Sequence, residues 1–413
     1  MASVASHQHP ELVTESMIGH LLAITNVPGI ASAIVRNDQP AGIICAGVRD
    51  VCSPLPVDEE TVFDAASLSK PVFAHALLQL ADQGVLSLDT PVANYLPGYM
   101  PADARASLIT ARHVLSHSAG LPNWRNDTFP LKTYFPPGQR FSYSGEGFLY
   151  LQKAIEVLTG EKIHSLTEQL VLGPFGMTRS SFVWDWRFDQ NRAAPHDDFG
   201  RPAVSWKPGE GNAASTLQTT AADYARFLLH VLNGSRLRPE TAELWLHPQI
   251  EVRHAKPQSL NDEPQDVDTG IAWGLGWGLE QNQETFFHWG NNGAFKAFTV
   301  GSMQTRDALV FFMNGASGLA LMPELVSTLM AGYRPSLAWL DYGRHDAPAR
   351  RMFQAARQHG AAATWDAIRD AGLSVEDQLW IARGLKAVGL DEDGLWLGER
   401  IKQSSAKISR PDQ

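Results

Sequence analysis

Ser67-Leu68-Ser69-Lys70 is the stretch that decides the fold of this chain. It places a hydroxyl and an amine three residues apart, at the start of a run with apolar residues at helical spacing. That spacing predicts a helix over 67–83, which Gly84 ends. Residues at i and i+3 share a helix face, so we expect the Ser67 hydroxyl and the Lys70 amine to lie side by side.

A lysine removed from water loses its proton more readily than in solution and can then act as a base. The pair therefore predicts a serine nucleophile that needs no histidine to activate it. The alternative interpretation is a serine that caps a helix, followed by a surface lysine. A second copy of the pattern, at 404–407, lies in a polar tail without an apolar run behind it, and we assign it no catalytic role.

Two further motifs follow the helix. Tyr143-Ser144-Gly145 comes after a turn-rich Pro-Pro-Gly-Gln segment, and His288-Trp289-Gly290 ends a short apolar strand. This order resembles that of the serine β-lactamase and penicillin-binding superfamily. It is most similar to class C β-lactamases, D-alanyl-D-alanine peptidases and family VIII carboxylesterases. The resemblance covers about residues 20–332 and includes the stretches 84–92, 113–122 and 172–177.

The resemblance implies a role for each motif residue. Ser67 is expected to be the nucleophile, with Lys70 and Tyr143 handling its proton, and which of the two accepts the proton stays open. His288 is expected to tune that pair or to orient the substrate. For Tyr143 the alternative is a half-buried aromatic beside a turn, and for His288 it is a histidine at a strand end.

Five residues are expected to bind the substrate. Gly290 would let the strand backbone approach it, and the N–H groups of Ser67 and Asn291 would form the oxyanion hole by resemblance. Gly145 and Trp289 complete the expected binding residues.

Two departures from the relatives predict the substrate class. Gly145 stands where β-lactamases and D-peptidases usually have an asparagine that contacts the substrate amide. His288 replaces the lysine of Lys-Thr-Gly, and a histidine is at most partly cationic at neutral pH. Both changes favour esters or small amides with apolar acyl groups. The alternatives are a β-lactamase or D-amino-acid peptidase, an acyltransferase, and a non-catalytic penicillin-binding module.

The resemblance implies an α+β fold, with an antiparallel sheet flanked by helices and an all-helical part. A domain over 1–334 would build its sheet part from about 20–65 and 280–334, and its helical part from about 75–275. Strands are predicted at 30–35, 41–48, 286–288, 297–300 and 308–313, and helices at 149–159, 220–232 and 319–330. Residues 335–413 form a helical extension, with helices at 347–358, 364–371 and 374–388 and a frayed tail from 402. Its role as a lid, a dimer surface or plain packing stays open.

Composition excludes several partners. The chain has 413 residues, a net charge of −10, and 44% hydrophobic residues, which suits a globular protein with a core. The negative charge disfavours nucleic acid and anionic membranes. Residues 1–10 are polar, and no apolar run nears the roughly 18 residues of a spanning helix. We therefore expect a soluble, cytoplasmic protein, unless a leader has been removed; a small-molecule substrate; and, as an open question, a homo-oligomer.

No metal or cofactor is expected. His196-Asp197-Asp198 has no partner pair at ligand spacing and is interpreted as a solvated loop. His113 and His117 are interpreted as structural, and the two cysteines, Cys45 and Cys52, as core residues or free thiols. No Gly-x-Ser-x-Gly occurs, which argues against an α/β-hydrolase. Four tryptophans either line an apolar acyl pocket or belong to the core: Trp124, Trp206, Trp273 and Trp277.

Overall fold

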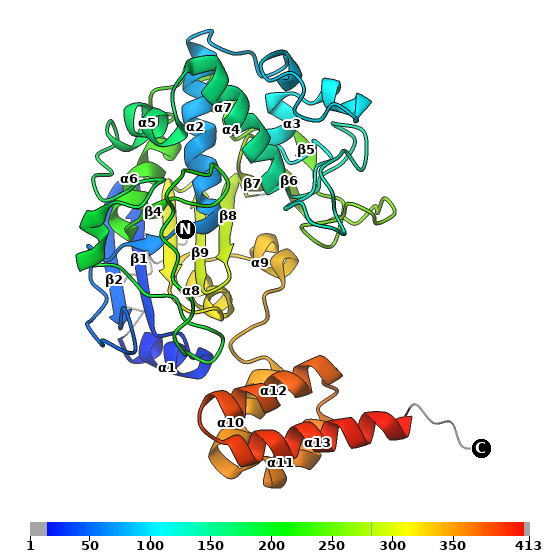
Figure 1. Ribbon diagram of the computed structural model, residues 1–413. Coiled ribbons are helices and arrows are strands. Elements are labelled where there is room, and N and C mark those ends of the chain that lie inside the picture. The colour runs from blue at the N-terminus through cyan, green and yellow to red at the C-terminus, as the bar shows by residue number, and fades with distance from the viewer. Residues whose placement is uncertain (1–14, 282, 409–413) are drawn as a thin grey trace, which may run out of the picture.

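A computed structural model of the chain describes residues 15–281 and 283–408, so the polar residues 1–10 lie outside the described part. One eight-stranded sheet, antiparallel throughout, forms its centre, in the order β2-β1-β10-β9-β8-β7-β6-β5 (Figure 1). The strands are β1 Gly29–Arg36, β2 Gln39–Gly47, β5 Ile250–Glu251, β6 Ile271–Trp273, β7 Gly278–Glu280, β8 Thr285–Asn292, β9 Phe295–Ser302 and β10 Asp307–Met313. The predicted α+β class with an antiparallel sheet is confirmed.

The hairpin of β1 and β2 lies at one edge of the sheet. Its two-residue turn places Asn37 and Asp38 at φ 48° and 61°, the left-handed conformation that a tight hairpin turn needs and that Asn and Asp tolerate well. On its other side β1 pairs with β10, with Ile30 opposite Met313. Strands from distant parts of the sequence therefore meet in one sheet, as predicted.

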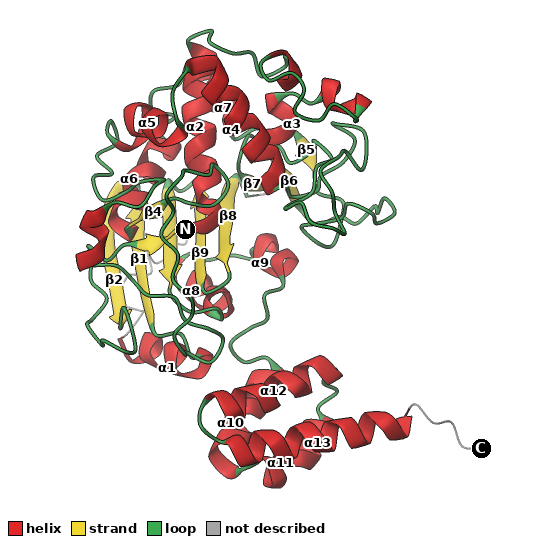
Figure 2. Cartoon of the chain, viewed as in Figure 1, coloured by secondary structure: helices red, strands yellow, loops and turns green. Residues whose placement is uncertain are grey.

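The central strands are buried on both faces of the sheet, and alternation along them divides the core. On β1, Ala31 and Ala33 join the cluster under the helix-rich side, whereas Ile30 and Ile34 join the cluster on the opposite face. Figure 2 shows the strands gathered in one layer between helices. The helix-rich side holds α2 Ser69–Asp82, α3 Ala111–Leu115, α4 Gly145–Thr159, α5 Ile163–Thr167, α6 Ala221–Leu232 and α7 Pro239–Trp245. A two-stranded ladder, β3 Phe63–Asp64 with β4 Gln218–Thr219, lies beside the start of α2.

The opposite face is covered by α1 Glu15–Thr25, α8 Met322–Leu329 and α9 Pro335–Leu340. Trp339 and Leu340 of α9 belong to the buried cluster on this face. Residues 335–340 therefore pack with the sheet, although the sequence assigned them to the C-terminal extension. The sequence missed this packing because α9 is too short to show a periodic pattern, although its last two residues, Trp339 and Leu340, are apolar.

The sheet also extends further than expected along the sequence. β5, β6 and β7 lie within or next to 75–275, the part expected to be all-helical, yet they form the edge beyond β8. Each has only two or three residues. Such short strands show no alternation of apolar and polar residues, and so the sequence gives no signal for them.

Four helices follow the sheet domain and share a separate buried cluster. They are α10 Pro348–His359, α11 Ala361–Asp370, α12 Val375–Ala387 and α13 Asp391–Ile408. Figure 1 shows them as a group below the sheet, joined to α9 by a single connection. The Phe199 ring of the main body packs against the rings of Phe353 and Trp380 of this group, with ring centroids 5.7 and 5.1 Å apart.

The prediction of a frayed tail from residue 402 is wrong for residues 402–408, because α13 continues to Ile408. Residues 409–413 lie outside the described part of the chain. Within the described residues, no helix is both long and apolar enough to cross a bilayer. Cys45 and Cys52 are free, as expected.

Candidate active site

Ser67 lies in a single 3-10 turn, Ala66–Leu68, that leads from β3 into α2. Ala66 adopts φ 48°, which costs free energy for a residue with a Cβ. The Asp64 carboxylate accepts a hydrogen bond from the Ala66 N–H at 2.7 Å, and the Asn292 side-chain amide donates to that carboxylate at 3.0 Å. Asp64 and Asn292 thus hold the turn that presents Ser67. Burial raises the pKa of Asp64 to about 6, against the hydrogen bonds that stabilise the anion.

Gly290 of β8 lets this turn approach the sheet. A Cβ built on Gly290 would lie 2.7 Å from the carbonyl oxygen of Ala65 and 3.1 Å from the Cβ of Ala66. The carbonyl oxygen of Ala65 and the Cβ atoms of Ala66 and Ala297 leave no room for a methyl group. The sequence expected Gly290 to admit the substrate, and the contact it makes in the structure is with the Ser67 turn.

Substituting Gly290 by alanine should therefore displace the Ser67 turn. We expect a loss of about 1–3 kcal/mol in the free energy of unfolding and at least about a tenfold slower reaction of Ser67 with a serine-reactive phosphonate. Denaturant titration and the rate of the mass increase measure the two. Gly42→Ala on β2 is the matched control, because a Cβ there meets no atom within 4 Å. A Gly290→Ala protein as stable and as reactive as the Gly42→Ala protein would contradict this account.

Lys70 is completely buried in the first turn of α2. Its Nζ lies 3.1 Å from the Ser67 Oγ and donates to the carbonyl oxygen of Ala214 at 2.8 Å. No carboxylate forms an ion pair with this ammonium among the described residues. Burial without a counter-charge holds the pKa of Lys70 well below its usual value. The amine is thereby suited to accept a proton from the adjacent hydroxyl.

Tyr143 is buried at the start of the segment that leads into α4. Its ring lies under the Lys70 ammonium, with Nζ 4.7 Å from the ring centroid. Burial raises the pKa of the Tyr143 phenol, although the neighbouring Ser67 hydroxyl lowers it. The phenol oxygen nevertheless has no hydrogen-bond partner of normal geometry among the described residues. Tyr143 is therefore a neutral phenol with a free hydroxyl beside Ser67 and Lys70.

His288 of β8 is buried behind these groups, with its ring centroid 6.1 Å from that of Tyr143. Its Nδ1–H donates to the carbonyl oxygen of Trp289 at 2.8 Å, so Nε2 carries the lone pair. That Nε2 has no partner among the described residues. Burial first, and the Lys70 charge second, lower the pKa of His288 to about 3, which keeps the ring neutral.

His117 lies in the same group, which the sequence did not predict. Its ring is 4.2 Å from that of Tyr143 between centroids, and its Nδ1 accepts the backbone N–H of Ser144 at 3.0 Å. Burial, reinforced by the nearby Lys70, holds the pKa of His117 well below its usual value. His117 has a backbone φ of 54°, but this conformation leaves no signal in the sequence. The expectation of a structural role omitted this contact with the Tyr143 ring.

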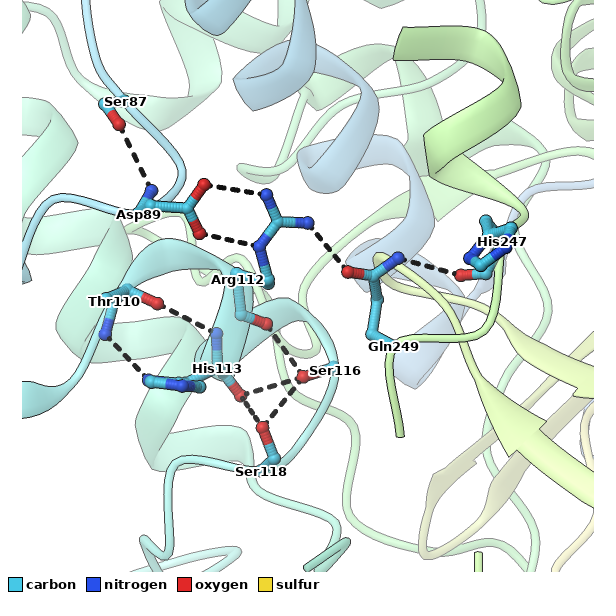
Figure 3. Close-up of polar contacts among 9 residues, drawn as sticks. All are labelled: Ser87, Asp89, Thr110, Arg112, His113, Ser116, Ser118, His247 and Gln249. Carbon is cyan, nitrogen blue, oxygen red and sulfur yellow. Dashed lines mark hydrogen bonds and ion pairs between the residues drawn. The ribbon is translucent and has the colours of Figure 1, made fainter. Parts of the chain in front are cut away.

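His113, by contrast, is structural, as Figure 3 shows. The His113 ring Nδ1 accepts the backbone N–H of Thr110, while the backbone N–H of His113 donates to the Thr110 hydroxyl, which caps α3. The neighbouring Arg112 binds both carboxylate oxygens of Asp89 and also donates to Gln249. This network joins the 84–92 stretch and the start of β5 to α3.

The motif residues meet at a cleft of about 380 Å³, within the usual range for ligand sites. Ser67, Tyr143, Trp289 and Asn291 line it. Lys70, His288 and Gly290 lie behind the lining. Eight lining residues were not expected from the sequence: Asn123, Lys256, Pro257, Gln258, Asn292, Leu340, Asp341 and Tyr342.

Gly145 does not line the cleft, because Trp124 covers it. A Cβ on Gly145 would lie 2.8 Å from the Trp124 ring and 2.9 Å from the carbonyl oxygen of Asn123. Trp124, which is 40% exposed, itself lines the cleft. The space next to the glycine is thus filled by an aromatic ring. Trp273 and Trp277 are core residues, and Trp206 is exposed on the surface.

The His196-Asp197-Asp198 segment differs from the expected solvated loop at its first residue. His196 is fully buried, and its ring nitrogens bond to the carbonyl oxygen of Asn314 at 3.0 Å and the N–H of Val51 at 3.3 Å. The histidine ties two loops together, a tertiary role without a local sequence signal. Within the described residues, no group of three or more His, Cys, Asp or Glu side chains could hold a metal ion.

Comparisons with curated proteins relate this chain to hydrolases and penicillin-binding proteins. It is 28% identical over 277 residues to Penicillin-binding protein 4 of Amycolatopsis lactamdurans. The aligned region spans 62% of this chain and 71% of that protein. It is 29% identical over 185 residues to Esterase EstB of Burkholderia gladioli, across 38% of this chain and 47% of the esterase. The latter match therefore spans about half the length of that relative.

Solved structures share the fold. A class C β-lactamase superposes with a TM-score of 0.65 at 18% identity, and the match covers 81% of this chain and 100% of that chain. The octameric penicillin-binding protein homologue from Pyrococcus abyssi gives a TM-score of 0.63 at 21% identity, covering 83% of this chain and 81% of that one.

The family model described as Beta-lactamase matches residues 14–325, which is well over half of the chain. The match agrees with the observed sheet between two helical layers and supports a hydrolase activity in general terms. On this match the protein belongs to the Beta-lactamase family.

Proposed function

We propose that the protein is a serine hydrolase that cleaves esters or small amides with apolar acyl groups through an acyl-enzyme on Ser67. The observation that carries the proposal is the 3.1 Å contact between the Ser67 hydroxyl and a buried Lys70 amine without a counter-charge. A base of this kind activates a serine without help from histidine. The similarity to an esterase supports the same chemistry.

The reaction would proceed in two steps. The Lys70 amine, with the Tyr143 phenol as relay, takes the proton of the Ser67 hydroxyl as its oxygen bonds to the substrate carbonyl carbon. The backbone N–H groups of Ser67 and Asn291 would stabilise the oxyanion. The bond to the leaving alcohol or amine then breaks, and the same proton passes to that group. Water attacks the acyl-enzyme in the second step, which releases the acid and restores Ser67.

The surroundings of His288 and Gly145 support the substrate class. A neutral His288 supplies no positive charge for the carboxylate of a β-lactam or a peptide. Trp124 over Gly145 presents an apolar ring in place of an amide side chain. A site without those polar groups loses its advantage for acylamide substrates.

We expect kcat/KM for short-chain nitrophenyl esters to exceed that for a chromogenic cephalosporin or a penicillin by at least about a hundredfold, roughly 2.7 kcal/mol of transition-state preference. Parallel assays on one preparation measure the ratio, and a pre-steady-state burst reports the acyl-enzyme. Equal or higher β-lactam values would mean that Gly145 and His288 do not set the substrate class.

A D-amino-acid peptidase is the second candidate, and Lys256 favours it. This exposed lysine lines the cleft and forms no ion pair among the described residues. Such a cation suits a substrate carboxylate remote from the cleaved bond. D-amino-acid amides and D-peptides with a free carboxylate belong in the same panel. A preference for the free carboxylate that Lys256→Gln removes would select this candidate.

The remaining alternatives are separable by product. An acyltransferase would give a new ester when an alcohol is added, and a non-catalytic module would bind without turnover. An oligomer is proposed only on the likeness to the octameric homologue from Pyrococcus abyssi. We also propose that the helices α10–α13 form a unit distinct from the hydrolase domain, because they share their own buried cluster.

A further inference from the structure

A segment outside the family match completes the wall of the cleft. The match ends at residue 325, whereas α9 and the two residues after it, here called the strap (residues 335–342), return to the cleft. Leu340, Asp341 and Tyr342 line it together with Ser67. The end of the strap is therefore placed to touch whatever group of a substrate points in its direction.

The strap begins at a buried anchor. Glu280 of β7 is almost fully buried, and its carboxylate accepts the Ser336 hydroxyl at 2.6 Å. The Arg334 guanidinium pairs with the same carboxylate at 3.2 Å, and the Arg334 side chain is only 7% exposed. A buried pair with these additional hydrogen bonds fixes geometry, because breaking it would leave an uncompensated charge. The first turn of α9 thus has a fixed position on the sheet.

A chain of aromatic rings anchors the other end of α9. The Trp339 indole N–H donates to the carbonyl oxygen of His254 at 2.9 Å. Its ring lies 5.8 Å from that of Trp289, which in turn lies 4.8 Å from that of Tyr143. The strap is therefore positioned by the same rings that surround the proposed proton relay.

Tyr342 ends the strap beside the reacting groups. Its residue is 37% exposed, yet burial raises the pKa of its phenol, while contacts with Asn291 and Trp289 lower that pKa. Tyr342 and Tyr143 both line the cleft. Asp341 precedes it at φ 43°, which turns the chain sharply at this point.

A second cavity lies on the other side of the strap. It also measures about 380 Å³, is mainly apolar, and is lined by Phe298, Met322 and Tyr333 among others. It shares Leu340, Asp341 and Tyr342 with the cleft. These three residues therefore form a partition between the site of the reaction and an apolar space large enough for an alkyl chain.

We propose that Tyr342 is a specificity-determining residue whose ring limits the length of the substrate group directed toward the strap. With the ring present, the cleft accepts short groups. Without it, the cleft opens into the apolar cavity and accepts long alkyl chains. The inference rests on the proposed role of Ser67 as nucleophile and adds a length limit to the substrate class.

Alkyl fluorophosphonates test the limit, because the phosphorus bonds to Ser67 and fluoride leaves whatever the natural substrate is. The rate of the mass increase is compared for ethyl and decyl probes. Each methylene that becomes buried adds roughly a factor of 4. We therefore expect Tyr342→Ala to raise the decyl-to-ethyl rate ratio at least about 15-fold, equivalent to roughly two buried methylenes. Tyr342→Leu should give a smaller rise and serves if the alanine variant does not fold.

Two variants make the test specific. Tyr342→Phe keeps the ring and should leave the ratio within about threefold of wild type. Tyr333→Ala is the matched control, because Tyr333 lines the second cavity and not the cleft. An unchanged ratio in a folded Tyr342→Ala protein would overturn the proposal, as would an equal rise in Tyr342→Phe. If neither probe labels Ser67 in any variant, the proposed function itself is wrong.

Acyl-chain and alkyl-chain ester series assign the direction of the limit. Nitrophenyl esters of increasing acyl length test the acyl side, and acetate esters of increasing alcohol length test the other side. Tyr342→Ala should relax the length dependence of one series by the same factor as the probe ratio. If the probes respond as expected but the length dependence of both ester series stays unchanged, the limit does not act on substrates and the proposal is contradicted.

Discussion

Ser67→Ala is expected to lower kcat/KM for short-chain nitrophenyl esters at least about 10⁴-fold, or roughly 5.4 kcal/mol of transition-state stabilisation. Without the hydroxyl, no acyl-enzyme can form, and Lys70 has no proton to accept. The residual rate comes from the oxyanion donors and the binding of substrate alone. Ester hydrolysis at saturating and subsaturating substrate separates kcat from KM.

The second Ser-x-x-Lys copy provides the control. Ser404 lies in α13, in the helical group apart from the cleft, and Ser404→Ala should retain the wild-type rate. Thermal unfolding of both variants shows whether the fold is intact. A folded Ser67→Ala protein with more than a tenth of the wild-type rate would contradict the assignment of the nucleophile.

Lys70→Ala and Tyr143→Phe should each lower turnover by about 10³-fold or more, and the double variant should lose little beyond the larger single loss. The Lys70 Nζ is 3.1 Å from the Ser67 Oγ and 4.7 Å from the Tyr143 ring centroid, and in the proposed mechanism both residues act on the Ser67 proton. Groups that act as a unit show strongly non-additive losses. A double-variant cycle on kcat measures the coupling.

Lys153→Ala, on the exposed side of α4, is the control for loss of a lysine and should have no effect. Removing Lys70 also deprives the carbonyl oxygen of Ala214 of its partner, so the unfolding free energy of each variant must be measured. Losses that multiply in the double variant would mean that Lys70 and Tyr143 act independently. The relay would then be wrong.

The parts of the site that the sequence predicted lie close together along the chain or carry a motif. Ser67 and Lys70 are three residues apart, and the helical pattern after them brings both to one side. Tyr143 and His288 were identified by the order of motifs, and the structure places both rings near Lys70. Their catalytic roles remain predictions.

The parts that it missed depend on contacts between distant segments. Asp64 and Asn292 are 228 residues apart, and nothing in either neighbourhood indicates that they meet. Tyr342 follows a six-residue helix in a segment without periodicity, so its place at the cleft depends on Glu280 and Trp339. The sequence gives no sign that His117 packs against Tyr143, because the ring contact arises only when the segments after α3 and before α4 meet.

The central claim is that Ser67 carries the acyl group, and one labelling experiment tests it most directly. The protein is treated with a serine-reactive phosphonate, digested, and the modified peptide is identified by mass. The account predicts one equivalent of adduct, on the peptide that contains Ser67, and none in Ser67→Ala. An adduct on the Ser404 peptide, or no adduct on a preparation that hydrolyses esters, would contradict it.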